Sequence, residues 1–137
     1  MTVSEGLPTA DRLHALPVFA ELSVEECEHI AQWCEVKTVE AGVELLRQGG
    51  FGYAFFVIES GTARVVQDGV TIRTLGPGDH FGEIAIFGAG ERTASVETIT
   101  PLTVVSMQGL EFRQVEVEQP AIAGKIRATM QARLDEH

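Results

Sequence analysis

The sequence predicts a single, mainly β domain of 137 residues, an eight-stranded β jelly roll with helices before and after it. Two observations carry this prediction. Between residues 36 and 107, short runs rich in β-branched and aromatic residues alternate with turns that contain glycine. On both sides of this region, apolar residues recur every three or four positions, which is typical of helices that bury one face.

We expect the N-terminal helices over residues 9–34, after a flexible start at residues 1–8. Apolar residues recur at helical spacing in this segment, and Pro17 divides the run. Ser23, three residues before Glu26, matches a capping box, in which each residue satisfies the backbone N–H of the other. A second helix is therefore predicted to begin directly after Ser23.

Eight strands are expected in the β region. The hairpin signal is clearest at Asp68-Gly69, because this pair favours a two-residue turn between antiparallel strands. Residues 82–87 break the strand pattern and can form a short helix between two strands. The predicted strands lie near residues 36–39, 43–47, 53–58, 62–67, 70–75, 79–81, 93–98 and 102–107.

The pattern returns to helices over residues 109–135. Pro120 is well placed to open the last helix, since proline is favoured in a first helical turn. Apolar residues four positions apart then give this helix one buried face. They are Ile122, Ile126, Met130 and Leu134.

The composition excludes several classes of partner. Twenty acidic against ten basic residues give a formal net charge of −10, whereas domains that bind nucleic acid or anionic membranes present a basic surface. We therefore expect no nucleic acid and no membrane partner. The longest apolar run, Ala54–Ile58, is also far shorter than the roughly 20 residues that span a bilayer. A bound anion would need a local positive site to hold it against the overall charge.

The two cysteines, Cys27 and Cys34, lie seven residues apart in one predicted helix. Seven helical residues rise about 10 Å, which is too far for a disulfide. Two free thiols suit a reducing compartment, so we expect a cytoplasmic protein. The four histidines are scattered, and we expect no metal site because no histidine–cysteine cluster has the required spacing.

Residues 81–96 combine groups that suit a small ligand carrying both a hydroxyl and a phosphate. Glu83 stands at the start of the predicted short helix, where its carboxylate can accept a hydrogen bond from a hydroxyl. Arg92 follows nine residues later, and its guanidinium can pair with phosphate oxygens through two parallel hydrogen bonds. Unpaired N–H groups at the start of the short helix add neutral donors.

These residues resemble the cyclic nucleotide-binding domain family. The match comprises Phe81-Gly82-Glu83-Ile84-Ala85-Ile86 and Arg92-Thr93-Ala94, in the order of the family's phosphate-binding cassette. The short predicted helix would then be the phosphate-binding helix of that cassette. Flanking motifs extend the resemblance to about residues 13–130. They are Leu16-Pro17-Val18-Phe19 with Leu22-Ser23, Phe56-Val57-Ile58-Glu59-Ser60-Gly61, and Leu75-Gly76-Pro77-Gly78-Asp79.

The resemblance implies a role for each cassette residue. Glu83, with the backbone at Gly82, would hold the ribose 2′-hydroxyl, and Arg92 would pair with the cyclic phosphate. Backbone N–H groups and the Thr93 hydroxyl would complete the phosphate cradle. The expected ligand-binding residues are Gly82, Glu83, Ile84, Ala85, Arg92, Thr93 and Ala94.

The last helix often covers the base in this family. The candidate base contacts here are Ile126, Thr129 and Met130, although core packing is the alternative role for Ile126 and Met130. Two features depart from the family pattern. Phe51 stands in a glycine-rich loop where a polar pair is usual, and Glu91 directly precedes the arginine. Because adjacent strand residues point to opposite faces, we expect Glu91 to face away from the ligand.

We therefore expect a stand-alone regulatory domain that binds a cyclic nucleotide, cAMP rather than cGMP, although Thr93 leaves the base undecided. It would signal through its C-terminal helices to a partner protein or as a homodimer. We expect neither an enzyme nor a cofactor, because no activated nucleophile, acid–base pair or metal set is visible.

Two other interpretations stay open. A degenerate family member would bind no nucleotide and serve as a protein-interaction module. A cupin-like metal enzyme would use His80 as a ligand, but no second histidine lies near it in the sequence.

Overall fold

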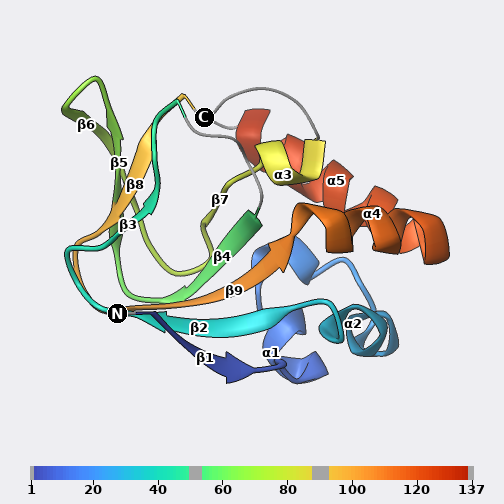
Figure 1. The fold of residues 1–137 in the computed structure, drawn as a ribbon. Coiled ribbons are helices and arrows are strands. Elements are labelled where there is room, and N and C mark those ends of the chain that lie inside the picture. The colour runs from blue at the N-terminus through green and yellow to red at the C-terminus, as the bar shows by residue number, and fades with distance from the viewer. Residues whose placement is uncertain (1, 50–53, 88–92, 136–137) are drawn as a thin grey trace.

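The computed structural model describes residues 2–49, 54–87 and 93–135 of the chain (Figure 1). The strands of these segments form two antiparallel sheets, with the orders β1-β2-β9-β4-β7 and β3-β8-β5-β6. This is the predicted mainly β fold, a jelly roll with flanking helices. The strands are β1 (Thr2–Gly6), β2 (Glu35–Val39), β3 (Glu44–Leu46), β4 (Ala54–Ser60), β5 (Ala63–Gln67), β6 (Val70–Leu75), β7 (His80–Phe81), β8 (Ser95–Thr98) and β9 (Leu102–Gln108).

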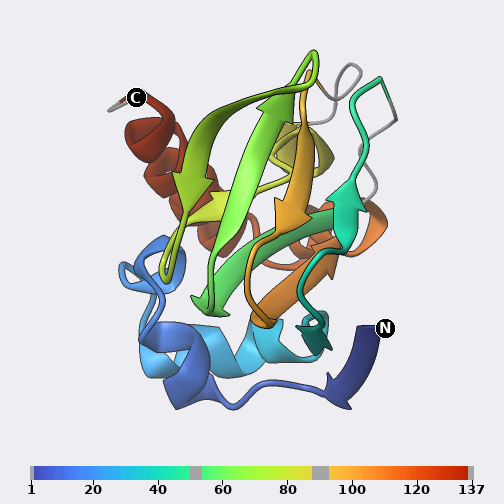
Figure 2. The same ribbon diagram turned by 90° about the vertical axis from the view of Figure 1, so that its left-hand side faces the viewer.

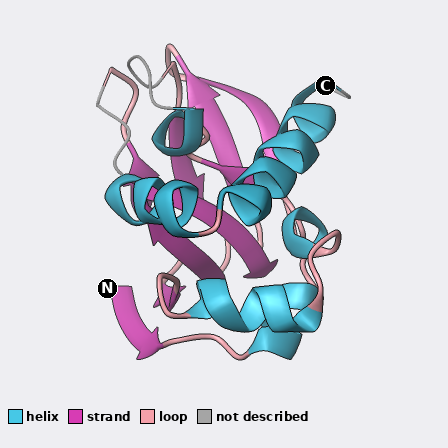
Figure 3. Ribbon diagram, turned by 90° about the vertical axis from the view of Figure 1, so that its right-hand side faces the viewer, coloured by secondary structure: helices cyan, strands magenta, loops and turns pink. Residues whose placement is uncertain are grey.

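Helices cover one side of the sandwich, in front of the strands in Figure 3, and the four-stranded sheet forms the opposite side in Figure 2. The predicted capping box is confirmed. Ser23 Oγ accepts a hydrogen bond from the Glu26 N–H at 3.0 Å, and Glu26 Oε1 accepts one from the Ser23 N–H at 2.9 Å. The helices are α1 (Ala10–His14), the 3-10 turn η1 (Pro17–Phe19), α2 (Val24–Ala31), α3 (Ile84–Phe87), α4 (Gly109–Glu118) and α5 (Pro120–Asp135).

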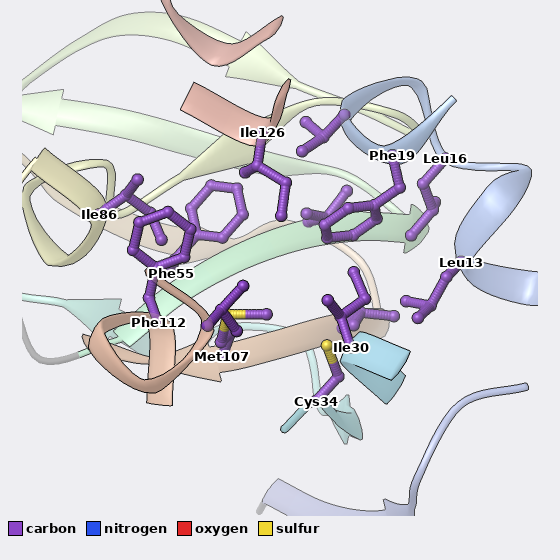
Figure 4. Packing of buried hydrophobic residues seen from close by; sticks show 14 of the residues in the cluster. Leu13, Leu16, Phe19, Ile30, Cys34, Phe55, Ile86, Met107, Phe112 and Ile126 are labelled. Atoms are coloured by element: carbon purple, nitrogen blue, oxygen red, sulfur yellow. The ribbon is translucent and has the colours of Figure 1, made fainter. Parts of the chain in front are cut away.

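Strand β4 separates two hydrophobic cores. Its side chains alternate between faces, so that Phe55 and Val57 join the core under the helices, whereas Phe56 and Ile58 join the core between the sheets. Figure 4 shows the first of these cores, where Phe55 from β4 lies with Phe112 from α4. Because β4 is buried on both faces, it reads in the sequence as a continuous apolar run.

The N-terminus differs from the prediction. The sequence predicts a flexible start at residues 1–8, but Thr2–Gly6 form β1, an edge strand paired with β2. All five of its residues are exposed, so the strand contributes no apolar face to either core. The strand forms through backbone pairing with β2, and the apolar pattern of residues 2–6 gives no sign of that pairing.

Candidate functional site

A cavity of about 360 Å³ opens between the segment that joins β7 to α3 and the strands of the four-stranded sheet. Five of the seven predicted ligand-binding residues line it, although they come from two segments, 82–84 and 93–94, that eight residues separate. Such convergence of polar and apolar groups in one concave site is typical of small-molecule binding sites. Its lining in the described part of the chain is Leu46, Val65, Ile72, Arg73, Phe81, Gly82, Glu83, Ile84, Thr93, Ala94 and Val96.

The turn from β7 into α3 requires a glycine. Phe81 is fixed by pairing with Phe56 of β4, and the two rings stack with their centroids 5.0 Å apart. Gly82 follows with a φ of +83°, in the left-handed region that other residues rarely adopt. The chain then turns directly into α3, where the Ala85 N–H donates to the Gly82 carbonyl at 3.0 Å.

Glu83 is the carboxylate of the cavity. Its side chain is about one quarter exposed (24%), and its Oε1 lies 2.8 Å from Nδ1 of the buried His80. Glu83 also lines a second, much smaller cleft on the side of His80. The carboxylate therefore stands between a buried imidazole and the open cavity, with a second oxygen left to accept a hydrogen bond.

Thr93 and Ala94 line the cavity directly before β8, as the cassette motif predicts. Arg92, Glu91 and Phe51 lie outside the described residues. The pairing of Arg92 with phosphate and the outward orientation of Glu91 therefore stay predictions.

One predicted phosphate donor is already used within the fold. Ala85 is buried, it is absent from the cavity lining, and its N–H is bonded to the Gly82 carbonyl. In contrast, Ile84 opens α3, where the first N–H groups of a helix have no intrahelical acceptor. In this conformation Ile84 can donate to a ligand, whereas the Ala85 N–H donates to Gly82, and its contact with phosphate stays a prediction.

The candidate base contacts on α5 do not lie at the cavity. Ile126 and Met130 are 1% and 0% exposed, and both belong to the core under the helices, which Figure 4 shows for Ile126. Thr129 is absent from the cavity lining as well. The i, i+4 apolar row of α5 packs against the domain, so the alternative role of core packing is correct for Ile126 and Met130 in this conformation.

Six of the described lining residues were not among the predicted ligand contacts, and two of these six are Ile72 and Arg73. They are neighbours on β6, which would normally point them to opposite faces. In the pairing of β5 with β6, Val65 faces Arg73 and Val66 faces Thr71, so Ile72 is an extra residue in a β-bulge. Bulges re-aim side chains, which accounts for two consecutive residues at one cavity.

Arg73 is exposed and forms no ion pair within the described segments. A guanidinium offers five N–H donors and no acceptor. Among the described residues, the cavity lining therefore includes both the Arg73 guanidinium, which has no ion-pair partner there, and the Glu83 carboxylate. A ligand with both acceptor and donor groups fits this arrangement.

The family model of the cyclic nucleotide-binding domain matches residues 36–117. The chain belongs to this family. That span runs from β2 to the end of α4 and includes every residue of the cassette. The resemblance stated from the cassette motif is thereby confirmed.

Curated relatives come from several kinds of cyclic nucleotide-binding domain protein. A "cAMP-dependent protein kinase regulatory subunit" of Yarrowia lipolytica is 32% identical over 72% of this chain and 26% of its own length. A "cGMP-dependent protein kinase, isozyme 1" of Drosophila melanogaster is 35% identical over 65% of this chain and 12% of its own. A "cyclic nucleotide-gated potassium channel" of Rhizobium etli is 30% identical over 84% of this chain and 32% of its own length. The chain thus spans a third or less of the length of these relatives.

Solved structures show the same fold at low sequence identity. A cyclic nucleotide-binding domain from Methylobacillus flagellatus superposes with a TM-score of 0.84 at 21% identity, covering 98% of this chain and 84% of that one. A regulatory domain of Toxoplasma gondii protein kinase A, crystallised with cAMP, superposes with a TM-score of 0.78 at 19% identity. The match covers 94% of this chain and 49% of that one. These likenesses establish the fold.

Two further structural findings concern metal sites and membrane-spanning helices. The described residues contain no group of three histidine, cysteine, aspartate or glutamate side chains that could hold a metal ion. Among the described helices, none combines the length and the apolar character that crossing a membrane requires.

Proposed function

We propose that this chain is a regulatory domain that binds a cyclic nucleotide, with cAMP as the first candidate. The observation that carries the proposal is the meeting of Glu83 with Thr93 and Ala94 around one cavity of about 360 Å³. This volume lies within the range of small-molecule sites. The relatives named as cAMP-dependent protein kinase regulatory subunits support cAMP.

Each group has a distinct task in this proposal. Glu83 accepts a hydrogen bond from the ribose 2′-hydroxyl, and the backbone at Gly82 supports the same contact. Arg92 pairs with the cyclic phosphate, which also receives the Ile84 N–H, the Ala94 N–H and the Thr93 hydroxyl. The hydrophobic wall of Leu46, Val65 and Val96 is left for the base.

The ligand acts by shifting a population of conformations. Phosphate draws α3 toward Arg92, and α4 and α5 fold against the strands in response. A ligand can shift this equilibrium only by the difference between its affinities for the two states. The domain itself catalyses no reaction and needs no cofactor. It works in the cytoplasm and passes the signal to a partner protein or to a second copy of the chain. Neither nucleic acid nor a membrane is a partner, which the net charge of −10 supports.

cGMP is the second candidate, and the position of Arg73 favours it. The guanine edge presents two acceptors, O6 and N7, to which arginine donates two hydrogen bonds, whereas adenine presents a donor at N6. Arg73 lines the cavity without an ion-pair partner in the described part of the chain, and Thr93 adds a hydroxyl. The relative named as a cGMP-dependent protein kinase also supports this base.

Calorimetric titration with cAMP and with cGMP tests the proposal. The wild-type chain is expected to bind at least one of them. Arg92→Ala should lose about 2–5 kcal/mol, which is roughly 30-fold to several thousand-fold in affinity, because the phosphate is left unpaired. The exposed Arg47 offers a matched control, and Arg47→Ala should bind as the wild type does. If the wild type binds neither nucleotide, the domain is a protein-interaction module instead.

A further inference from the structure

His80 is the one buried ionisable side chain that touches the candidate site in the described part of the chain. It is 6% exposed, and its Nδ1 lies 2.8 Å from Oε1 of Glu83, three residues later. The cassette motif gives no role to this position. A buried imidazole in contact with the carboxylate of a binding site needs an explanation of its own.

The ring of His80 is held from two sides. In the pairing of β7 with β4, its backbone lies opposite Val57. Its ring packs against that of Phe55, with centroids 5.6 Å apart and planes inclined at 52°. Phe55 is 1% exposed and belongs to the core under the helices. The imidazole is therefore fixed by the core and does not follow the ligand.

Glu83 is also the acceptor that remains for His80. Four charged side chains share a small cleft with His80, and two of them, Arg73 and Arg133, cannot accept a hydrogen bond. The Asp79 carboxylate already accepts from the Gly76 N–H at 2.8 Å, and its other oxygen lies 3.6 Å from Arg133 Nη2. Glu83 is thus the carboxylate left to accept a hydrogen bond from the Nδ1–H of His80.

We infer that His80 is a positioning residue for Glu83. This inference deepens the proposed function and rests on it. His80 carries its proton on Nδ1, and this N–H donates a hydrogen bond to Glu83 Oε1. With Oε1 fixed, the carboxylate presents Oε2 to the cavity, ready to accept the hydroxyl of the ligand. The sequence could not supply this role, because nothing in the spacing shows that His80 is buried.

The test compares a ligand that has the hydroxyl with one that lacks it. Titration with cAMP and with 2′-deoxy-cAMP (or the guanine pair, if cGMP binds more tightly) gives an affinity ratio. For the wild type we expect a ratio of about 10- to 100-fold in favour of the hydroxyl, the range of hydrogen bonds to charged groups. Glu83→Ala defines the ratio when the carboxylate is absent.

Two substitutions separate orientation from mere packing. His80→Phe keeps a ring against Phe55 but has no donor, so the ratio should fall by roughly threefold or more, toward the Glu83→Ala value. His80→Asn keeps an N–H near the position of Nδ1 and should restore the ratio. His29→Phe, at an exposed histidine of α2, is the control and should leave it unchanged.

The outcomes distinguish this inference from the proposed function. A purely structural His80 would weaken both ligands equally in His80→Phe, and an unchanged ratio overturns the positioning role while nucleotide binding stands. Failure of the wild type to bind either ligand overturns the proposed function, and this role with it. If His80→Phe does not fold, His80→Val, which is smaller than histidine and also lacks a donor, takes its place.

Discussion

Arg113 of α4 donates a hydrogen bond from Nη2 to the main-chain carbonyl of Ala85 in α3, at 3.0 Å. It also donates to the next carbonyl, that of Ile86. The last carbonyls of a helix have no intrahelical donor, and a cation at this end also interacts favourably with the negative end of the helix dipole. Two contacts hold the guanidinium in place. Its Nη1 lies 3.1 Å from Glu116 Oε1, and its Cζ lies 5.3 Å from the centroid of the Phe112 ring. The candidate phosphate-binding helix is thus tied directly to the C-terminal helices.

Removing this guanidinium should loosen α3. In Arg113→Met the two carbonyls lose their charged donor, and we expect the free energy of unfolding to fall by about 1–3 kcal/mol. Hydrogen exchange should rise at the amides of α3, which are bonded to the carbonyls of Gly82 and Glu83. Denaturant titration and exchange mass spectrometry measure the two effects. Arg47→Met removes an exposed guanidinium and should change neither. Unchanged exchange in α3 would show that the two helices are not coupled through Arg113.

Local signals allowed much of the fold to be predicted. The turn at Asp68-Gly69 has φ values of +52° and +79°, as a two-residue hairpin turn of type I′ requires, and it joins β5 to β6. The capping box at Ser23 depends on two residues of one turn. In such cases the residues that make the structure are neighbours in the chain, so the pattern contains the whole interaction.

Long-range features could not be predicted in this way. The side chain of Arg73 reaches the cavity because a bulge shifts the register of β6, and a bulge has no reliable sequence signature here. The burial of Ile126 and Met130 depends on which surfaces α5 meets. An apolar row predicts a buried face, but it does not say whether a ligand or the protein covers it.

The base preference should depend on Arg73. If its guanidinium donates to O6 and N7 of guanine, Arg73→Leu should lower the affinity for cGMP by about 5- to 100-fold and leave that for cAMP nearly unchanged. Parallel titrations of the wild type and the variant with both nucleotides provide the measurement. Arg47→Leu serves as the control, since this arginine is 84% exposed and absent from the cavity lining. Equal losses of affinity for the two nucleotides would instead show that Arg73 contacts the ribose or the phosphate, which both ligands share.

Gly61 should tolerate no side chain. A Cβ at this position would lie 2.3 Å from the carbonyl oxygen of Pro101, and its φ of +94° is strained for other residues. We expect Gly61→Ala to lower the free energy of unfolding by about 2–4 kcal/mol, from overpacking and backbone strain together. Gly124→Ala is the matched control, because a Cβ added at this position of α5 would meet no atom within 4 Å. This change should stabilise the protein by about 0.5–1 kcal/mol. Urea unfolding followed by the fluorescence of Trp33, the single tryptophan, measures both.

The two thiols should make stability depend on pH in the alkaline range. Burial, with a smaller contribution from the charge of Glu26, raises the pKa of Cys27 to about 11, and burial also raises the pKa of Cys34. Both thiols ionise near pH 9 in the unfolded chain but stay protonated in the fold. The unfolded state therefore binds fewer protons above pH 9, and the free energy of unfolding falls as the pH rises.

Between pH 9 and 11 each thiol should contribute a slope of about −1.4 kcal/mol per pH unit. Urea unfolding of the wild type, compared with a Cys27→Ala/Cys34→Ala variant, isolates this contribution from the other groups that titrate there. The variant should be less stable at neutral pH, because the alanines leave small cavities, but its stability should fall less steeply. The thiols of the native wild type should also react with a thiol reagent at pH 8 far more slowly than those of the unfolded chain. Equal alkaline slopes for the two proteins would contradict the burial of the thiols in solution.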